Sequence, residues 1–154
     1  MIESIELVRN LYPDEVYISG GVDQSAIDMA QNYLNCVFPQ RYSEFLNDYG
    51  SFSFFGFEIL GILGTNFESS VITDSIRTTI YYRRKGLLED NLIAIYDDNG
   101  DVLHILQAGD SEDSGVFVWD LSSRSIVRTF STSFVEYTND RIETAIQNLS
   151  QDLS

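Results

Sequence analysis

His104 is the only histidine in the chain, so it is the only candidate for a histidine base. It lies in the apolar run 102–106, where strand alternation places it on the face opposite Leu103 and Ile105. We therefore expect a histidine on a partly exposed sheet face. A catalytic histidine needs a nucleophile and an orienting acid, and no recognisable motif supplies them. The sequence predicts no catalytic residue.

Cys36 is the only cysteine, so an intramolecular disulfide is impossible and no oxidising compartment is implied. Its neighbours Val37 and Phe38 form an apolar setting that is typical of an inert, buried thiol. The chain also contains no glycine loop ending in Lys-Ser or Lys-Thr and no metal motif with two histidines. We predict no enzyme activity and no cofactor.

Asp97, Asn99 and Asp101 occupy positions 1, 3 and 5 of a calcium-loop pattern. That pattern requires glycine at position 6 and glutamate at position 12, whereas this chain has Gly100 at position 4 and Ala108 at position 12. An Asn-Gly pair between two apolar runs is the strongest short hairpin signal. We predict a hairpin here and no metal site. Paired carboxylates can carry out acid–base catalysis, so a small hydrolase is one possible function of the chain. Adjacent acids are, however, expected by chance in so acidic a chain.

The net charge is the most unusual property of the sequence. The chain has 24 Asp and Glu against 9 Lys and Arg, which gives a formal charge of −15. Such a surface repels nucleic acid and anionic lipid and attracts a basic protein or a cation; solubility alone is the simpler explanation. The acids are concentrated between Lys85 and Arg124, where no basic residue occurs: Glu89, Asp90, Asp97, Asp98, Asp101, Asp110, Glu112, Asp113 and Asp120.

The first half of the chain reads as mainly helical. Apolar residues at helical spacing predict helices over 2–11, 23–35 and 39–50, with Asp23 as an N-cap and Gly50 as a helix terminator. The aromatic segment 52–62 predicts two short strands with a bend at Gly56.

The second half changes to strands. Residues 69–85 combine Ile72, Ile76 and Ile80 at helical spacing with a strand-like run; we predict a helix. Strands are expected over 92–96, 102–106, 115–119 and 125–130, followed by a closing helix that starts at Ser133. We thus predict one α+β domain over residues 1–154, with an antiparallel or mixed meander of five to six strands and helices packed on one side.

Length and composition agree with this class. A chain of 154 residues that is 44% hydrophobic can bury a sizeable core. We find neither a membrane-spanning apolar run nor a secretory signal, so we expect a cytoplasmic protein with no membrane contact.

An ordered set of motifs resembles the SUKH superfamily over roughly residues 23–140. The segment 38–50, FPQRYSEFLNDYG, carries a proline, then Tyr, then Phe-Leu, then Gly. Phe55-Gly56, Leu60-Gly61-Ile62, the run 92–96, the run 116–120 and Ser133-Phe134 follow in the same order as in the family. The resemblance implies a non-enzymatic role. Many bacterial members look like immunity proteins that neutralise a polymorphic toxin, often a nuclease, whereas others, including a yeast cell-wall regulator, look like interaction modules.

Charge and resemblance together lead to one hypothesis. A nuclease presents a basic cleft to nucleic acid, and an acidic face could occupy that cleft. The hypothesis assigns this face to the loops of the meander, with ordinary solvated turns as the alternative: Asp97, Asp98, Asp101, Asp110, Glu112 and Asp113. The expected partner is a basic toxin domain and not nucleic acid. The alternative function is a general interaction or regulatory module of the same fold; the sequence leaves the toxin and the oligomeric state open.

Overall fold

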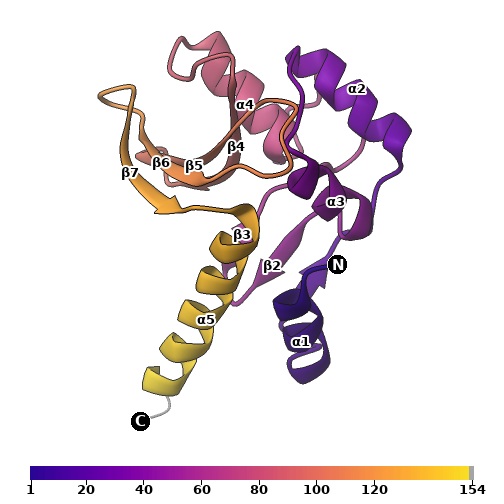
Figure 1. Cartoon of the computed structure of the whole chain (residues 1–154), viewed down its shortest axis with the longest axis vertical. Helices are drawn as coiled ribbons and strands as arrows, with labels where there is room; N and C mark the ends of the chain where they lie inside the picture. Colours follow the sequence, from indigo (N-terminus) through magenta and orange to yellow (C-terminus); the bar gives the residue numbers. More distant parts are fainter. Residues whose placement is uncertain (153–154) are drawn as a thin grey trace.

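The computed structural model describes residues 1–152, which form five helices and two antiparallel sheets (Figure 1). The α+β class is therefore confirmed. In chain order the elements are α1 (Glu3–Leu11), β1 (Val16–Ile18), α2 (Gln24–Leu34), α3 (Gln40–Asp48), β2 (Phe52–Phe54), β3 (Phe57–Ile59), α4 (Ser75–Arg84), β4 (Leu92–Asp98), β5 (Val102–Gln107), β6 (Val116–Asp120), β7 (Ser125–Ser131) and α5 (Phe134–Asp152).

The two sheets join at their neighbouring edges. One sheet has the order β1-β2-β3 and the other is the meander β4-β5-β6-β7. Directly after β3, the Leu60 N–H donates to the Ile95 carbonyl of β4 at 2.8 Å. The described residues contain seven strands instead of the expected five to six. The strand that the sequence did not indicate is β1, a three-residue segment that pairs with β2.

The helix ends follow their sequence signals. The Asp23 carboxylate accepts from the Ala26 N–H at 2.9 Å and caps α2 as predicted. After α3, Gly50 has φ +76°, the left-handed conformation that terminates a helix, and a Cβ there would lie 2.0 Å from the Gly20 carbonyl oxygen. The chain can approach residue 20 this closely only with glycine at position 50.

Apolar side chains point from both faces of the meander. On one face Ile93, Ile95, Leu106 and Val116 join the main core, to which all five helices contribute. On the other face Leu103, Ile105 and Trp119 pack with Tyr82 of α4 and Leu88 of the loop after it. The main core thus lies on the helix-covered side, while a smaller core forms beneath the end of α4.

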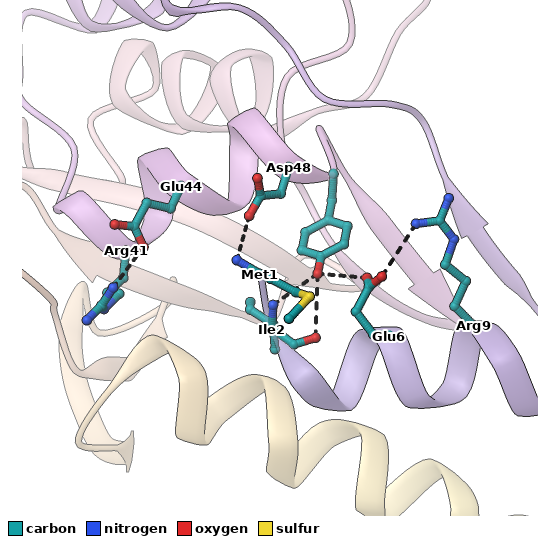
Figure 2. Close-up of polar contacts among 8 residues, drawn as sticks. Met1, Ile2, Glu6, Arg9, Arg41, Glu44 and Asp48 are labelled. Atoms are coloured by element: carbon teal, nitrogen blue, oxygen red, sulfur yellow. Dashed lines mark hydrogen bonds and ion pairs between the residues drawn. The ribbon is translucent and has the colours of Figure 1, made fainter.

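Tyr49 connects α1 to the end of α3. Its hydroxyl accepts from the Ile2 N–H at 3.0 Å and donates to the Glu6 carboxylate at 2.9 Å. The Glu6 carboxylate also pairs with Arg9 at 3.8 Å, and the Met1 amine pairs with the Asp48 carboxylate at 2.7 Å. Both ion pairs are drawn as dashed lines in Figure 2. Burial raises the pKa of Tyr49 to about 12, so the hydroxyl stays protonated and able to donate.

Helix α4 covers the outer edge of β4. The Ala94 N–H donates to Thr79 Oγ1 at 2.9 Å, and the Ser75 hydroxyl donates to the Ala94 carbonyl at 2.6 Å. Arg83 Nη2 donates to the Leu92 carbonyl at 3.2 Å. Ser75 and Thr79 are fully buried, which is unusual for helical Ser and Thr and is explained by these bonds.

The predicted helix over 69–85 is confirmed only from Ser75 onward. Asp74 is its N-cap and accepts from the Arg77 N–H at 2.9 Å. Ile76 is fully buried as expected, but Ile72 precedes the helix and is 37% exposed. The helix starts late because the buried Asp74 ends the loop with an ion pair to Arg77 at 2.5 Å.

The opposite edge of the meander, β7, is open and irregular. Its residues 125–129 are exposed, and its register with β6 shifts twice, between Val116 and Phe117 and between Val118 and Trp119. Bulges of this kind twist an edge strand and disfavour pairing with another chain.

Replacing Thr79 with valine should destabilise the fold. The substitution keeps the shape of the side chain but leaves the buried Ala94 N–H without an acceptor, which costs about 1–3 kcal/mol. Urea unfolding followed by circular dichroism would measure the loss. Thr144→Val, at an exposed position of α5, is the matched control and should change the free energy of unfolding little. Equal stability of both variants would contradict the edge-covering role of Thr79.

Candidate interaction surface

The six acids of the hypothesis fall into two groups at opposite ends of the meander. Asp97, Asp98 and Asp101 surround the turn from β4 to β5, whereas the other three lie in the loop from β5 to β6. Strand β5 separates the groups; it is six residues long, and at about 3.3 Å per residue the separation is roughly 20 Å. The structure brings the acids together within each group but not into one cluster.

The turn from β4 to β5 is the hairpin that the Asn-Gly pair predicted. Asn99 and Gly100 both have positive φ, at 55° and 76°. The Asp97 carboxylate accepts from the Gly100 N–H at 2.9 Å and from the Tyr82 hydroxyl at 2.7 Å. Asp97 therefore shapes the turn and ties it to α4, while Asp98 and Asp101 are exposed.

Asp120 belongs to the same end of the sheet. It is the last residue of β6 and pairs in register with Val102, the first residue of β5. Backbone hydrogen bonding from Ser123 lowers the pKa of its carboxyl and keeps it ionised. We call Asp97, Asp98, Asp101 and Asp120 the acidic end. Asp120 was absent from the predicted six because its place depends on the register of β5 and β6.

The second group is largely engaged in the fold. Asp113 Oδ1 accepts from the Ser114 N–H at 2.7 Å and from the Phe134 N–H at 3.1 Å, at the start of α5. Glu112 pairs with Arg41 at 2.9 Å, and its carbonyl accepts from the Arg41 N–H, also at 2.9 Å. These contacts hold the loop against α3, so Asp110 is the member of this group left exposed without such a contact.

The structure corrects the expected exposure of His104. Its side chain does lie on the face opposite Leu103, but α5 covers that face, and His104 is only 6% exposed. Its Nδ1 lies 2.6 Å from the Tyr137 hydroxyl, within a ring of aromatic side chains. Burial, with a further contribution from the nearby charges of Arg141 and Arg128, lowers the pKa of His104 from its ordinary value to about 4. Neutral His104 is thus part of the packing between α5 and the meander.

Cys36 lies between α2 and α3 and is half-buried, with its Sγ 3.8 Å from Arg83 Nη2. Burial raises the pKa of the thiol despite the guanidinium, which favours the weakly nucleophilic protonated form.

A groove that the sequence did not indicate lies beside the acidic end. It encloses about 530 Å³ between α4 and the loop before it. Phe67, Ile80 and Tyr81 are among its apolar lining residues, and Asp97 stands at its border with the turn. The exposed Val71 belongs to the same loop.

Two structural findings concern metals and membranes. Within residues 1–152, no three His, Cys, Asp or Glu side chains are grouped so that they could hold a metal ion. None of the helices in the described part of the chain has the length and apolar character to cross a bilayer.

The fold and the exposed turns define an α+β domain with two joined antiparallel sheets and acids gathered at one end of the larger sheet. A family model described as SUKH_5, SMI1-KNR4 cell-wall, matches residues 1–143. The chain belongs to this SUKH family, which confirms the resemblance found in its motifs. Among curated proteins, none matches the chain significantly.

The buried His104 should make the protein less stable in acid. Its pKa is about 4 in the fold against 6.5 as the ordinary value, so the unfolded chain binds more protons between these pH values. The free energy of unfolding should therefore fall as the pH drops from about 6.5 to about 4, by roughly 3 kcal/mol at about 1.36 kcal/mol per pKa unit.

Chemical denaturation at several pH values would measure this slope. His104→Asn removes the titrating group, and the difference in slope between the two proteins isolates its contribution from that of the carboxylates. Parallel pH profiles for the two proteins would rule out the assigned role of His104.

Proposed function

We propose that this chain is a non-catalytic immunity protein, which binds and neutralises a cognate polymorphic toxin in the cytoplasm. The toxin is a nuclease domain with a basic surface. Family membership supports the general role, because the SUKH resemblance implies immunity proteins and interaction modules. The charge of −15 supports a basic partner.

The observation that carries the proposal is the acidic end. Asp98 and Asp101 are exposed on a hydrogen-bonded hairpin turn, with Asp120 beside them at the end of the neighbouring strand. By contrast, Asp113 and Glu112 are used to hold a loop and a helix start. Within the acidic end, Asp97 and Asp120 are held by hydrogen bonds from Tyr82, Gly100 and Ser123, whereas Asp98 and Asp101 are exposed and free to meet a partner. We propose the acidic end as the principal contact, with Asp110 as a peripheral one.

Neutralisation then follows from electrostatics and occlusion. A nuclease must attract phosphate groups, which it does with clustered Lys and Arg. The acidic end attracts the same cluster, speeds the encounter and covers the surface where nucleic acid would bind. This mechanism requires no proton transfer and no covalent step by the immunity protein.

Co-expression tests the proposal directly. The chain would be expressed with the product of the gene immediately upstream of its own, and growth would be measured together with co-purification. We expect the upstream product to be toxic alone, and the chain to restore growth and form a stable complex. An upstream product that is harmless and does not bind would refute immunity and favour the regulatory module.

Neutralising the acidic end should slow association. The variant Asp98→Asn/Asp101→Asn should bind the inactivated toxin domain with an association rate about tenfold lower at low salt, and the difference should shrink as salt screens the charges. The control Asp14→Asn/Glu15→Gln makes the same change in net charge at exposed positions of the loop between α1 and β1. Stopped-flow binding would compare the two, and equal rates would show that total charge, not the acidic end, governs association.

A further inference from the structure

Three exposed apolar side chains lie in or beside the groove between α4 and the loop that precedes it. Val71 is 90% exposed, Tyr81 is 53% exposed and Ile72 is 37% exposed. Ile72 and Tyr81 line the groove directly. These side chains add little to the core, and apolar groups that gather around one concavity are typical of a protein-binding site.

The arginines that line the groove are already compensated. Arg77 is buried in its ion pair with Asp74 at 2.5 Å, and it also donates to the Leu63 carbonyl at 3.2 Å. Arg84 pairs with Glu68 at 3.0 Å. The remaining cation, Lys85, has its ammonium 4.9 Å from the centre of the Tyr81 ring. The groove is thus an apolar concavity with a polar rim, which is not the arrangement of an anion site.

The groove is continuous with the acidic end. Asp97 borders the groove and also begins the acidic turn, and the Tyr82 hydroxyl holds its carboxylate at 2.7 Å. Tyr82 itself is packed edge-to-face against Tyr81, with ring centres 5.0 Å apart. A partner that covers Asp97 and Asp98 therefore reaches Tyr81, and near this border the three acids of the turn outnumber Lys85.

We propose that the groove receives a large apolar side chain of the same basic partner, presented next to the Lys and Arg residues that meet the acidic end. This inference rests on the proposed function. The two parts of the surface then have different tasks. The acids attract the partner and set the association rate, whereas the groove retains it by burying apolar area and sets the dissociation rate.

Two substitutions test the groove. Tyr81→Ala removes an exposed lining side chain, and Val71→Ser changes an exposed side chain of the loop beside the groove. The fold should survive both, and thermal unfolding would confirm this for each variant. The controls are Val127→Ser and Tyr17→Ala, because Val127 is 57% and Tyr17 is 63% exposed on other elements. The probe is the inactivated domain of the toxin encoded immediately upstream, immobilised for surface plasmon resonance.

We expect Tyr81→Ala and the double variant Val71→Ser/Tyr81→Ala to dissociate at least about tenfold faster than the wild type, with association rates within about twofold of it. The two controls should match the wild type in both rates. Dissociation rates unchanged in the groove variants would overturn the inference.

The combined results separate the two proposals. If the wild-type chain binds and the groove variants dissociate at the wild-type rate, the groove proposal is overturned and the immunity proposal stands. If the groove variants dissociate faster but Asp98→Asn/Asp101→Asn associates at the wild-type rate, the groove proposal is supported. The proposal that the acids steer the partner is then overturned. A wild-type chain that does not bind the upstream product overturns both.

Discussion

The outer edge of β4 is the constraint on which the arrangement of this molecule depends. Along the edge of a strand, backbone N–H and C=O groups have no neighbouring strand to bond. Where that edge is buried, these groups must find other hydrogen-bond partners. Here Thr79 and Ser75 bond Ala94, Arg83 bonds Leu92, and the Leu60 N–H bonds Ile95. These bonds determine where α4 lies, and they also join the small sheet to the meander. A single strand edge thus connects the two halves of the fold.

The position of α4 in turn shapes the candidate surface. Because α4 lies along β4, Tyr82 reaches the turn after that strand and holds Asp97. The same placement leaves Tyr81 on the outer side of the helix, beside the loop that Asp74 and Arg77 anchor. The apolar groove and the acidic end are therefore two parts of one framework, whereas the loop with Glu112 and Asp113 belongs to the contact between α3 and α5.

The sequence patterns predicted correctly those features that are determined by residues close together in the chain. The N-cap at Asp23, the terminator at Gly50 and the Asn-Gly hairpin depend on residues close in sequence, and the structure contains all three. Strand β1 escaped prediction because three residues show no period and depend on a distant partner, β2. His104 was assigned to the correct face but to the wrong environment, because the cover comes from α5, more than thirty residues later. The division of the six acids into two groups likewise follows from strand direction, which no single motif reveals.

The two edges of the meander have a further consequence. Helix α4 closes one edge, and the bulged strand β7 forms the other. Addition of a foreign strand to the meander is therefore disfavoured at both edges, so the proposed binding surface consists of side chains on a turn and a groove. Asp98 and Asp101 are exposed turn residues. Substitutions at these exposed positions carry little folding penalty, so the side chains of the proposed contact can change while the hydrogen-bonded framework stays the same.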